Sequence, residues 1–308
     1  MQGVVYKSTG SWYNVKDDSG KMWNARIKGI FKLDDITSSN PIAVGDIVDF
    51  ETENLNEQTG IITKIYDRKN HINRQSPRVK SQQHIVAANV DQSLLIATIR
   101  EPRTSQGFID RFLVACEMYH VPAIILFNKV DLYKDKDLTK FNKLKEVYTA
   151  IGYRVLGASL KQDQNVEDIK TLLKHKITLI SGHSGVGKST FINTIIPHAQ
   201  IKTQDVSGWS GKGQHTTTFA EMYELPFDGK IIDTPGMKEF GLVGVERQEV
   251  SGYFPEMKDR LNNCQFNNCL HINEPGCAIK QGVIDGEIDE DRYVSYFNIV
   301  DSIPERKW

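Results

Sequence analysis

The sequence has no long apolar run, few cysteines and almost no net charge. These absences argue against a membrane protein, a disulfide-rich protein and a protein drawn to nucleic acid by its overall charge. No apolar run approaches the roughly 20 residues of a membrane-spanning helix, and the opening MQGVVYKSTG has neither the basic start nor the apolar core of a secretory signal. Lys and Arg number 38 and Asp and Glu 39, so the net charge of −1 gives no overall attraction to nucleic acid. We therefore expect a cytoplasmic protein without membrane contact, in which any nucleic-acid binding uses local patches.

Three of the four cysteines lie close together and indicate a metal site. Cys264, Cys269, His271 and Cys277 form the pattern C-x4-C-x-H-x5-C. In a reducing cytoplasm such a cluster favours metal binding over disulfides. Three thiolates and one imidazole complete a tetrahedral shell, which is typical of a structural zinc site with no open position for catalysis. The alternative is a set of reduced cysteines in a small core, but the surrounding segment has few large apolar residues, so we predict one structural Zn²⁺. We interpret Cys116, inside a helical pattern, as a core residue.

Residues 1–68 have the composition and spacing of a small β-domain. Short stretches rich in β-branched and aromatic residues are separated by turn signals such as DDSG. Five strands of this kind fit an OB-type barrel, a fold that binds single strands and RNA, although other small barrels fit as well. Trp12, Tyr13 and Trp23 either stack on bases or pack the barrel interior. The five stretches are GVVYK, SWYNVKD, KMWNARIK, GDIVDFE and GIITKIY.

A basic linker at residues 69–84 is expected to follow this barrel. The stretch DRKNHINRQSPRVK, residues 67–80, carries five Lys or Arg against one acid, together with a proline. Such a stretch either contacts phosphates or is a solvated connector, and its composition leaves both open.

Residues 85–245 change to the alternating pattern of an α/β domain. The apolar runs SLLIATI, VPAIILFNK, KITLISG and KIIDTPG are typical of buried parallel strands. Helical stretches lie between them, namely GFIDRFLVACEMYH, DLTKFNKLKEVYTAIG and NVEDIKTLLKH. This alternation predicts a doubly wound parallel sheet.

The last region, residues 246–308, contains the predicted zinc site and ends in an amphipathic helix. In DEDRYVSYFNIVDSI, Tyr293, Tyr296, Phe297 and Val300 recur at helical spacing. We interpret this aromatic stripe as core packing rather than as a partner surface.

A phosphate-binding loop is the strongest signal in the sequence. GHSGVGKS fits G-x-x-x-x-G-K-[ST], follows the apolar strand ITLIS and opens the helix KSTFINTII. The glycines let backbone N–H groups turn toward a phosphate at the positive end of the helix. Lys188 then bridges the β- and γ-phosphates and the Ser189 hydroxyl holds Mg²⁺. The nucleotide-binding residues predicted from this loop are Gly182, His183, Ser184, Gly185, Val186, Gly187, Lys188, Ser189 and Thr190.

A magnesium and γ-phosphate switch is predicted downstream of the loop. In IIDTPG, Asp233 ends a buried strand and would hold the magnesium ion through a water molecule, while Gly236 would offer its N–H to the γ-phosphate. Between the two motifs, SGKGQHTTTF is a glycine-rich stretch with three threonines. We expect Thr217 to complete the magnesium shell, with Thr216 as the alternative because the register is open.

The tetrapeptide NKVD predicts a reader of guanine. Asp131 can accept both the ring N–H and the exocyclic amine of guanine, a donor pair that adenine does not offer. Asn128 would join this loop to the phosphate loop, and the Lys129 stem would cover the base. NKVD follows a buried strand, where open α/β sheets bind ligands. Ser159, in GASL, would close over the base through backbone contacts.

The order of these motifs is unusual. An ordinary guanine-nucleotide switch has its phosphate loop first, whereas here NKVD at 128–131 precedes GHSGVGKS at 182–189. Rejoining a sheet at surface loops preserves its spatial contacts, because chain termini often lie close together. We interpret the order as a circular permutation of one nucleotide site.

The chain resembles the RsgA/YjeQ family of circularly permuted, small-subunit-dependent GTPases over essentially its whole length. The resemblance is carried by the barrel, NKVDL, GHSGVGKST, GQHTTT, DTPG and the zinc segment, in that order. It implies a cytoplasmic GTPase that uses Mg²⁺ with GTP, contacts the 30S subunit and 16S rRNA late in subunit assembly, and is released after subunit-stimulated hydrolysis to GDP. Nothing in the sequence suggests a dedicated dimer interface, so we expect a monomer. The resemblance also points to His215 as the residue that positions the attacking water, with a hinge or an RNA contact as the alternative role for it. Met237 stands where many switch GTPases have glutamine, and a thioether cannot orient water, so we expect slow intrinsic hydrolysis.

Two other interpretations remain open. An ATP-using P-loop enzyme would have no use for Asp131, and a non-catalytic RNA-binding scaffold would have no use for Lys188, Ser189 and Asp233 together. A turnover assay with GTP, ATP and purified small subunits distinguishes all three.

Overall fold

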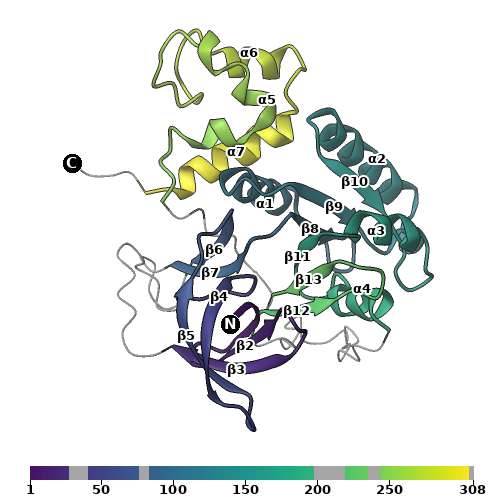
Figure 1. The fold of residues 1–308 in the computed structure, drawn as a ribbon. Coiled ribbons are helices and arrows are strands. Elements are labelled where there is room, and N and C mark those ends of the chain that lie inside the picture. The colour runs from purple at the N-terminus through teal and green to yellow at the C-terminus, as the bar shows by residue number, and fades with distance from the viewer. Residues whose placement is uncertain (28–40, 76–82, 198–218, 235–241, 243, 305–308) are drawn as a thin grey trace.

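The computed structural model describes residues 1–27, 41–75, 83–197, 219–234, 242 and 244–304. It divides into the barrel with the N-terminus, the α/β sheet beside it, and a helical C-terminal region at the opposite end from the barrel (Figure 1). Within the described residues, no helix is both long and apolar enough to cross a membrane.

The N-terminal region is a five-stranded barrel, as predicted. Its strands follow the order β1-β2-β3-β5-β4, and β4 returns to pair with β1, which closes the barrel. The β3–β5 pairing is parallel and the other pairings are antiparallel, an arrangement that fits the OB type. The strands are β1 (Gln2–Ser8), β2 (Tyr13–Asp17), β3 (Met22–Ile27), β4 (Ile47–Asn54) and β5 (Thr59–Ile65).

The structure settles the role of two of the three aromatic residues considered for base stacking. Tyr13 and Trp23 are 1% and 3% exposed and lie in the barrel core, so they pack the interior. The Trp23 indole also donates to the Asp17 carboxylate at 2.7 Å and contacts the ring of Phe50. Trp12, at 39% exposure, is the one of the three that still faces solvent.

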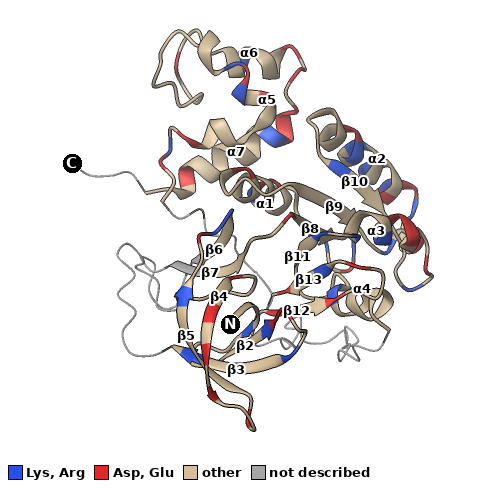
Figure 2. Cartoon of the chain, in the orientation of Figure 1, with Lys and Arg blue, Asp and Glu red and all other residues tan. Residues whose placement is uncertain are grey.

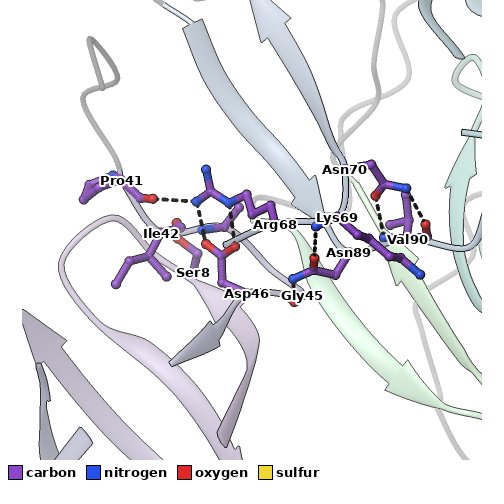
Figure 3. A network of polar contacts seen from close by, with 11 residues as sticks. Ser8, Pro41, Ile42, Gly45, Asp46, Arg68, Lys69, Asn70, Asn89 and Val90 are labelled. Atoms are coloured by element: carbon purple, nitrogen blue, oxygen red, sulfur yellow. Dashed lines mark hydrogen bonds and ion pairs between the residues drawn. The ribbon is translucent and has the colours of Figure 1, made fainter. Parts of the chain in front are cut away.

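Strands β6 (His71–Gln75) and β7 (Gln83–Ala88) form a hairpin that begins in the expected linker, residues 69–84, and extends beyond it. Arg68, one of the basic residues that we considered for phosphate contacts, is engaged inside the protein (Figure 3). Its guanidinium donates to both carboxylate oxygens of the fully buried Asp46 at 2.6 Å and to the Pro41 carbonyl at 2.7 Å. Such a bidentate contact fixes the barrel against the chain that leaves it.

Asn89 strengthens the same junction (Figure 3). Its side chain donates to the Gly45 carbonyl at 2.9 Å and accepts from the Lys69 N–H at 2.9 Å. Gly45 has φ of +94°, and a Cβ there would lie 2.1 Å from the Ala88 carbonyl oxygen. Only glycine fits this close approach of two backbones.

The central region is the predicted doubly wound sheet, with β10 and β12 in addition to the four predicted strands. Its order is β10-β9-β8-β11-β13-β12; the first five strands are parallel, and β12 pairs antiparallel with β13. These strands are β8 (Gln92–Ala97), β9 (Ala123–Phe127), β10 (Arg154–Gly157), β11 (Ile177–Ser181), β12 (Glu221–Glu224) and β13 (Lys230–Asp233). The sheet core divides between two faces, because α1 and α2 pack on one and α3 and α4 on the other. The helices are α1 (Gln106–Met118), α2 (Asp135–Ala150), α3 (Val166–Leu173) and α4 (Lys188–Ile195), and a 3₁₀ turn, η1 (Val130–Leu132), follows β9.

The barrel and the α/β sheet are continuous through backbone pairing. Strand β1 pairs antiparallel with β12, with Lys7 opposite Glu221. The two units therefore share one eleven-stranded sheet.

The C-terminal region is built from short helices and one longer helix that packs on α1. The longer helix, α7, is the predicted closing helix, and its Tyr296 and Val300 are buried, whereas Phe297 is 40% exposed. Tyr296 and Val300 of the stripe therefore pack in the core, as predicted, whereas Phe297 faces solvent. The elements are η2 (Val250–Tyr253), α5 (Pro255–Lys258), η3 (Leu261–Asn263), α6 (Ala278–Ile284) and α7 (Glu290–Ser302).

A buried ion-pair network joins this region to the α/β sheet. Arg292 of α7 is 1% exposed and donates to Asp110 of α1 at 2.7 Å and to both carboxylate oxygens of Glu256 in α5 at 2.7 and 3.0 Å. Tyr148 of α2 donates to the same Asp110 oxygen at 2.7 Å. These contacts fix α7 on α1, since moving the two helices apart would leave buried charges without their partners.

Candidate nucleotide and metal sites

The residues predicted to bind a nucleotide gather at the carboxyl edge of the parallel strands. The phosphate loop follows β11, the Asn-Lys-x-Asp loop follows β9, residues 158–160 follow β10 and Asp233 ends β13. β11 lies between β8 and β13, so the phosphate loop occupies the middle of this edge. Open α/β sheets bind their ligands there.

The phosphate loop has the backbone that a phosphate cradle requires. Gly182, Gly185 and Gly187 all have positive φ, at 144°, 82° and 105°. A Cβ on Gly182 would lie 2.4 Å from the Ile96 carbonyl oxygen, and one on Gly187 would lie 2.4 Å from the Asn128 side-chain nitrogen. The glycines are therefore required both by the turn and by the packing of neighbouring loops.

Lys188 begins α4 and folds back over the loop. Its ammonium donates to the carbonyls of Gly182 at 2.7 Å and His183 at 2.8 Å. Burial lowers the pKa of Lys188, and the nearby Asp233 carboxylate partly opposes this. A phosphate in the loop would supply the counter-charge that this ammonium needs.

Asn128 makes the contact between the two loops that we expected. It is 3% exposed; its amide donates to the Val186 carbonyl at 2.8 Å, and its carbonyl oxygen accepts from the Leu160 N–H at 3.2 Å. Lys129, in the left-handed region with φ of 64°, donates from its ammonium to the Gly185 carbonyl at 2.9 Å. Segments far apart in the chain are thus hydrogen-bonded into one structure.

Asp131 and Ser159 occupy different environments at this edge. Asp131 is exposed in the 3₁₀ turn after β9, so its carboxylate is accessible to a base. Ser159 is fully buried, and its carbonyl accepts from the N–H groups of Gln162 at 3.1 Å and Gln164 at 3.0 Å. These bonds close the turn after β10, and the Leu160 N–H bond to Asn128 holds that turn against the base-reading loop.

Tyr133 is a site residue that sequence reasoning missed. Its hydroxyl donates to the Asn128 carbonyl at 3.1 Å and accepts from the Ile99 N–H at 3.3 Å. It therefore holds the base-reading loop against the loop after β8. The only signal in the sequence was its position two residues after NKVD. A single tyrosine belongs to no recognised motif, so its role could not be predicted.

His183 was predicted as part of the phosphate loop, and its ring packs on Phe108 of α1. The ring centroids are 3.7 Å apart with an interplanar angle of 33°. Burial lowers the pKa of His183, and the charge of Lys188 lowers it further. The imidazole is therefore neutral near pH 7, and it connects the phosphate loop to the first turn of α1.

Asp233 lies where a magnesium-binding carboxylate is expected. It is 3% exposed at the end of β13, beside β11 and the phosphate loop. Ser189 lies in the first turn of α4. His215, Thr216, Thr217, Gly236 and Met237 lie outside the described residues.

The predicted zinc ligands converge in the C-terminal region. The ligand atoms of Cys264, Cys269, His271 and Cys277 all lie within 4.8 Å of one another. The His271 Nδ1 atom lies 3.3 Å from the Cys277 sulfur and 3.5 Å from the Cys264 sulfur, close to the ~3.6 Å between ligands of a tetrahedral zinc ion. Burial raises the pKa of the Cys269 thiol to about 12. A bound cation would therefore be needed to hold that thiolate, and this residue set could hold zinc.

The surroundings of the cluster orient its ligands. The Tyr293 hydroxyl donates to the His271 carbonyl at 2.6 Å, and the Tyr296 hydroxyl donates to the Leu270 carbonyl at 2.8 Å. Cys277 caps α6, and its sulfur accepts from the Lys280 N–H at 3.5 Å. Backbone N–H contacts of this kind are typical outer contacts of metal-bound thiolates.

A phosphate loop, an acid at the end of the neighbouring strand and an Asn-Lys-x-Asp loop on one sheet edge define a P-loop protein that binds guanine nucleotides. The order of its strands along the chain makes it a circularly permuted member of that class. The family model for the RsgA GTPase matches residues 65–243, and the model for the RsgA N-terminal domain matches residues 2–62. The chain belongs to the RsgA GTPase family.

Individual relatives agree over nearly the whole chain. The small ribosomal subunit biogenesis GTPase RsgA of Christiangramia forsetii is 50% identical over 302 residues, which are 98% of this chain and 96% of the relative. The crystal structure of YjeQ from Thermotoga maritima has a TM-score of 0.79 at 32% identity and covers 99% of both chains. The structure of YloQ, described as a circularly permuted GTPase, has a TM-score of 0.73 at 30% identity and covers 99% of this chain and 96% of that chain.

Proposed function

We propose that this protein is a GTPase that binds the small ribosomal subunit and its 16S rRNA during late maturation in the cytoplasm. It hydrolyses GTP to GDP and phosphate, and the subunit stimulates this turnover. The observation that carries the proposal is Asn128, which joins the base-reading loop to the phosphate loop at 2.8 Å. This contact supports a single site in which one loop reads guanine and the other holds the phosphates.

Each described residue of the site has a role in this reaction. Asp131 accepts the two donors of guanine, and Lys188 exchanges its carbonyl contacts for the β- and γ-phosphates. Ser189 and Asp233 would hold Mg²⁺, which when bound neutralises charge on the phosphate oxygens. Thr217 and Gly236 would complete the magnesium shell and contact the γ-phosphate.

The attacking water would be positioned by His215. Met237 stands where many switch GTPases have glutamine, and its thioether has no donor and is only a weak acceptor, so it cannot orient the water. We therefore infer slow intrinsic hydrolysis that accelerates when the small subunit binds.

Contacts with the subunit would come from the barrel and from the zinc-containing region. The relatives are named small ribosomal subunit biogenesis GTPases, and an OB-type barrel with an exposed Trp12 is suited to RNA. One Zn²⁺ on Cys264, Cys269, His271 and Cys277 would fix the fold of the C-terminal region. We propose that the protein acts as a monomer.

The test is turnover of GTP and ATP by the purified protein, with and without small ribosomal subunits. We expect GTP turnover that rises with added subunits, and no turnover of ATP. His215→Ala should keep GTP affinity but lose about 100-fold of the stimulated rate, the usual contribution of a positioned proton-transfer group.

The matched control is His175→Asn, at an exposed histidine before β11 on the opposite edge of the sheet, where φ is 59°. Asparagine tolerates that backbone, so its turnover should equal the wild type. Equal turnover of ATP would instead indicate a general P-loop enzyme, and no turnover of either nucleotide would indicate a scaffold. Unchanged stimulated hydrolysis in His215→Ala would exclude the role of that histidine.

A further inference from the structure

The barrel meets the α/β sheet beside the carboxylate proposed to hold magnesium. Lys7 of β1 lies opposite Glu221 of β12, and its ammonium forms an ion pair with the Glu221 carboxylate at 2.9 Å. Glu221 in turn lies opposite Asp233 in the β12–β13 pairing. Lys7, Glu221 and Asp233 therefore form one row across three neighbouring strands.

The three side chains of this row share one face of the sheet. Met222 and Ile232, the neighbours of Glu221 and Asp233 in the chain, are buried together in the cluster on the other face. Because successive side chains of a strand alternate between faces, Glu221 and Asp233 point to the face covered by α4. Directly opposed residues of an antiparallel pair have Cβ atoms about 5 Å apart. The Lys7–Glu221 ion pair thus lies next to Asp233.

A second set of contacts joins the same strands on the opposite face. Glu224 of β12 accepts from the Tyr6 hydroxyl at 2.8 Å and from the Lys16 ammonium at 2.6 Å. Figure 2 shows basic and acidic positions next to each other where β12 approaches the barrel. These contacts hold β1 and β2 to β12 without Lys7, so a change at Lys7 alters charge while the seam remains.

We propose that Lys7 and Glu221 are positioning residues that set the charge beside Asp233 and thereby tune the affinity of the nucleotide site for Mg²⁺. The barrel, through Lys7, is then an electrostatic part of the GTPase site. This inference rests on the proposed function, because it takes Asp233 as the magnesium carboxylate.

The proposal fixes the sign of each substitution. Lys7→Met leaves Glu221 as an uncompensated negative charge near the ion, which attracts Mg²⁺ more strongly. Glu221→Gln leaves the Lys7 ammonium uncompensated, which repels it. The double variant restores local neutrality, so its Mg²⁺ affinity should return to the wild-type value. Both side chains are 32% exposed, so water weakens the effect to about threefold to tenfold at low salt, and to less at high salt.

The experiment measures the Mg²⁺ concentration that half-maximally slows release of a fluorescent GDP. We expect the midpoint to fall in Lys7→Met, to rise in Glu221→Gln and to return to the wild-type value in the double variant. The matched control is Lys16→Met, which removes an ion pair from the opposite face of β12 and should leave the midpoint unchanged.

Midpoints that shift in opposite directions in the single variants, and return to the wild-type value in the double variant, indicate a charge effect. Loss of packing would shift the midpoints of both single variants in the same direction. Shifts of the same sign, or no shift, would overturn the inference, and Glu221→Gln with the double variant decides it if Lys7→Met fails to fold. A wild-type protein that binds no GDP, or whose GDP release ignores Mg²⁺, would instead contradict the proposed function.

Discussion

At the scale of single residues, Asn128 and Asp131 divide the work of the base-reading loop. Asn128 is 3% exposed and bonded to both neighbouring loops, whereas Asp131 is exposed. A buried amide with fixed partners is structural, and an accessible carboxylate can take a ligand. The sequence predicted the Asn128 contact between loops because the tetrapeptide specifies that chemistry, and the reading of guanine by Asp131 stays a prediction. It could not predict Tyr133 or the contact between the Phe108 and His183 rings, because these depend on which loops meet in space.

Asp131→Asn should exchange the base preference of the site. The asparagine amide would face the exocyclic amine of guanine, donor against donor, but it would match the carbonyl that xanthine carries there. Losing a charge-assisted pair and leaving a donor unpaired costs about 3 kcal/mol, so GTP affinity should fall about 100-fold while XTP affinity rises. Equilibrium binding of the two nucleotides measures this, with Asp135→Asn in the first turn of α2 as the control. Retained preference for GTP would mean that the base is read elsewhere.

At the scale of elements, predictions succeeded where a segment is long or flanked by its own signals. Strands β8, β9, β11 and β13 and helices α1 to α4 were expected from apolar runs and helical spacing, and they are present. Strand β12 was missed because it has four residues, and its partner β1 lies far away in the chain. The polar hairpin β6–β7 was expected to be a linker, because backbone pairing leaves no mark on the composition of HINRQ.

The zinc segment is the element whose order should depend on a ligand. The helices η3 and α6 have three and seven residues, too short to be stable alone. We expect one zinc per chain in the wild type. Cys264→Ser should lose most of it and become sensitive to protease between residues 261 and 284, while GDP affinity stays unchanged. Metal analysis with limited proteolysis checks this, and Cys116→Ser, at the buried cysteine in α1 outside the cluster, should keep its zinc. A metal-free Cys264→Ser variant that resists protease like the wild type would contradict a structural role.

At the scale of the whole molecule, the order of strands in space explains how a permuted chain forms one site. The phosphate-loop strand β11 lies centrally between β8 and β13, although β8 to β10 precede it in the chain. The motif order made this arrangement predictable. The Arg292 network was not predictable, because EDRYV reads as a solvated face and its partner Asp110 lies 182 residues away. Long-range contacts of this kind fix the C-terminal region on α1.

The most direct test of the account is a crystal structure of the protein with Mg²⁺ and a non-hydrolysable GTP analogue. We predict that the guanine donors lie within hydrogen-bond distance of the Asp131 carboxylate and that the phosphates lie in the loop from Gly182 to Ser189. A purine ring bound away from Asp131 while the phosphates occupy that loop would contradict the single permuted site.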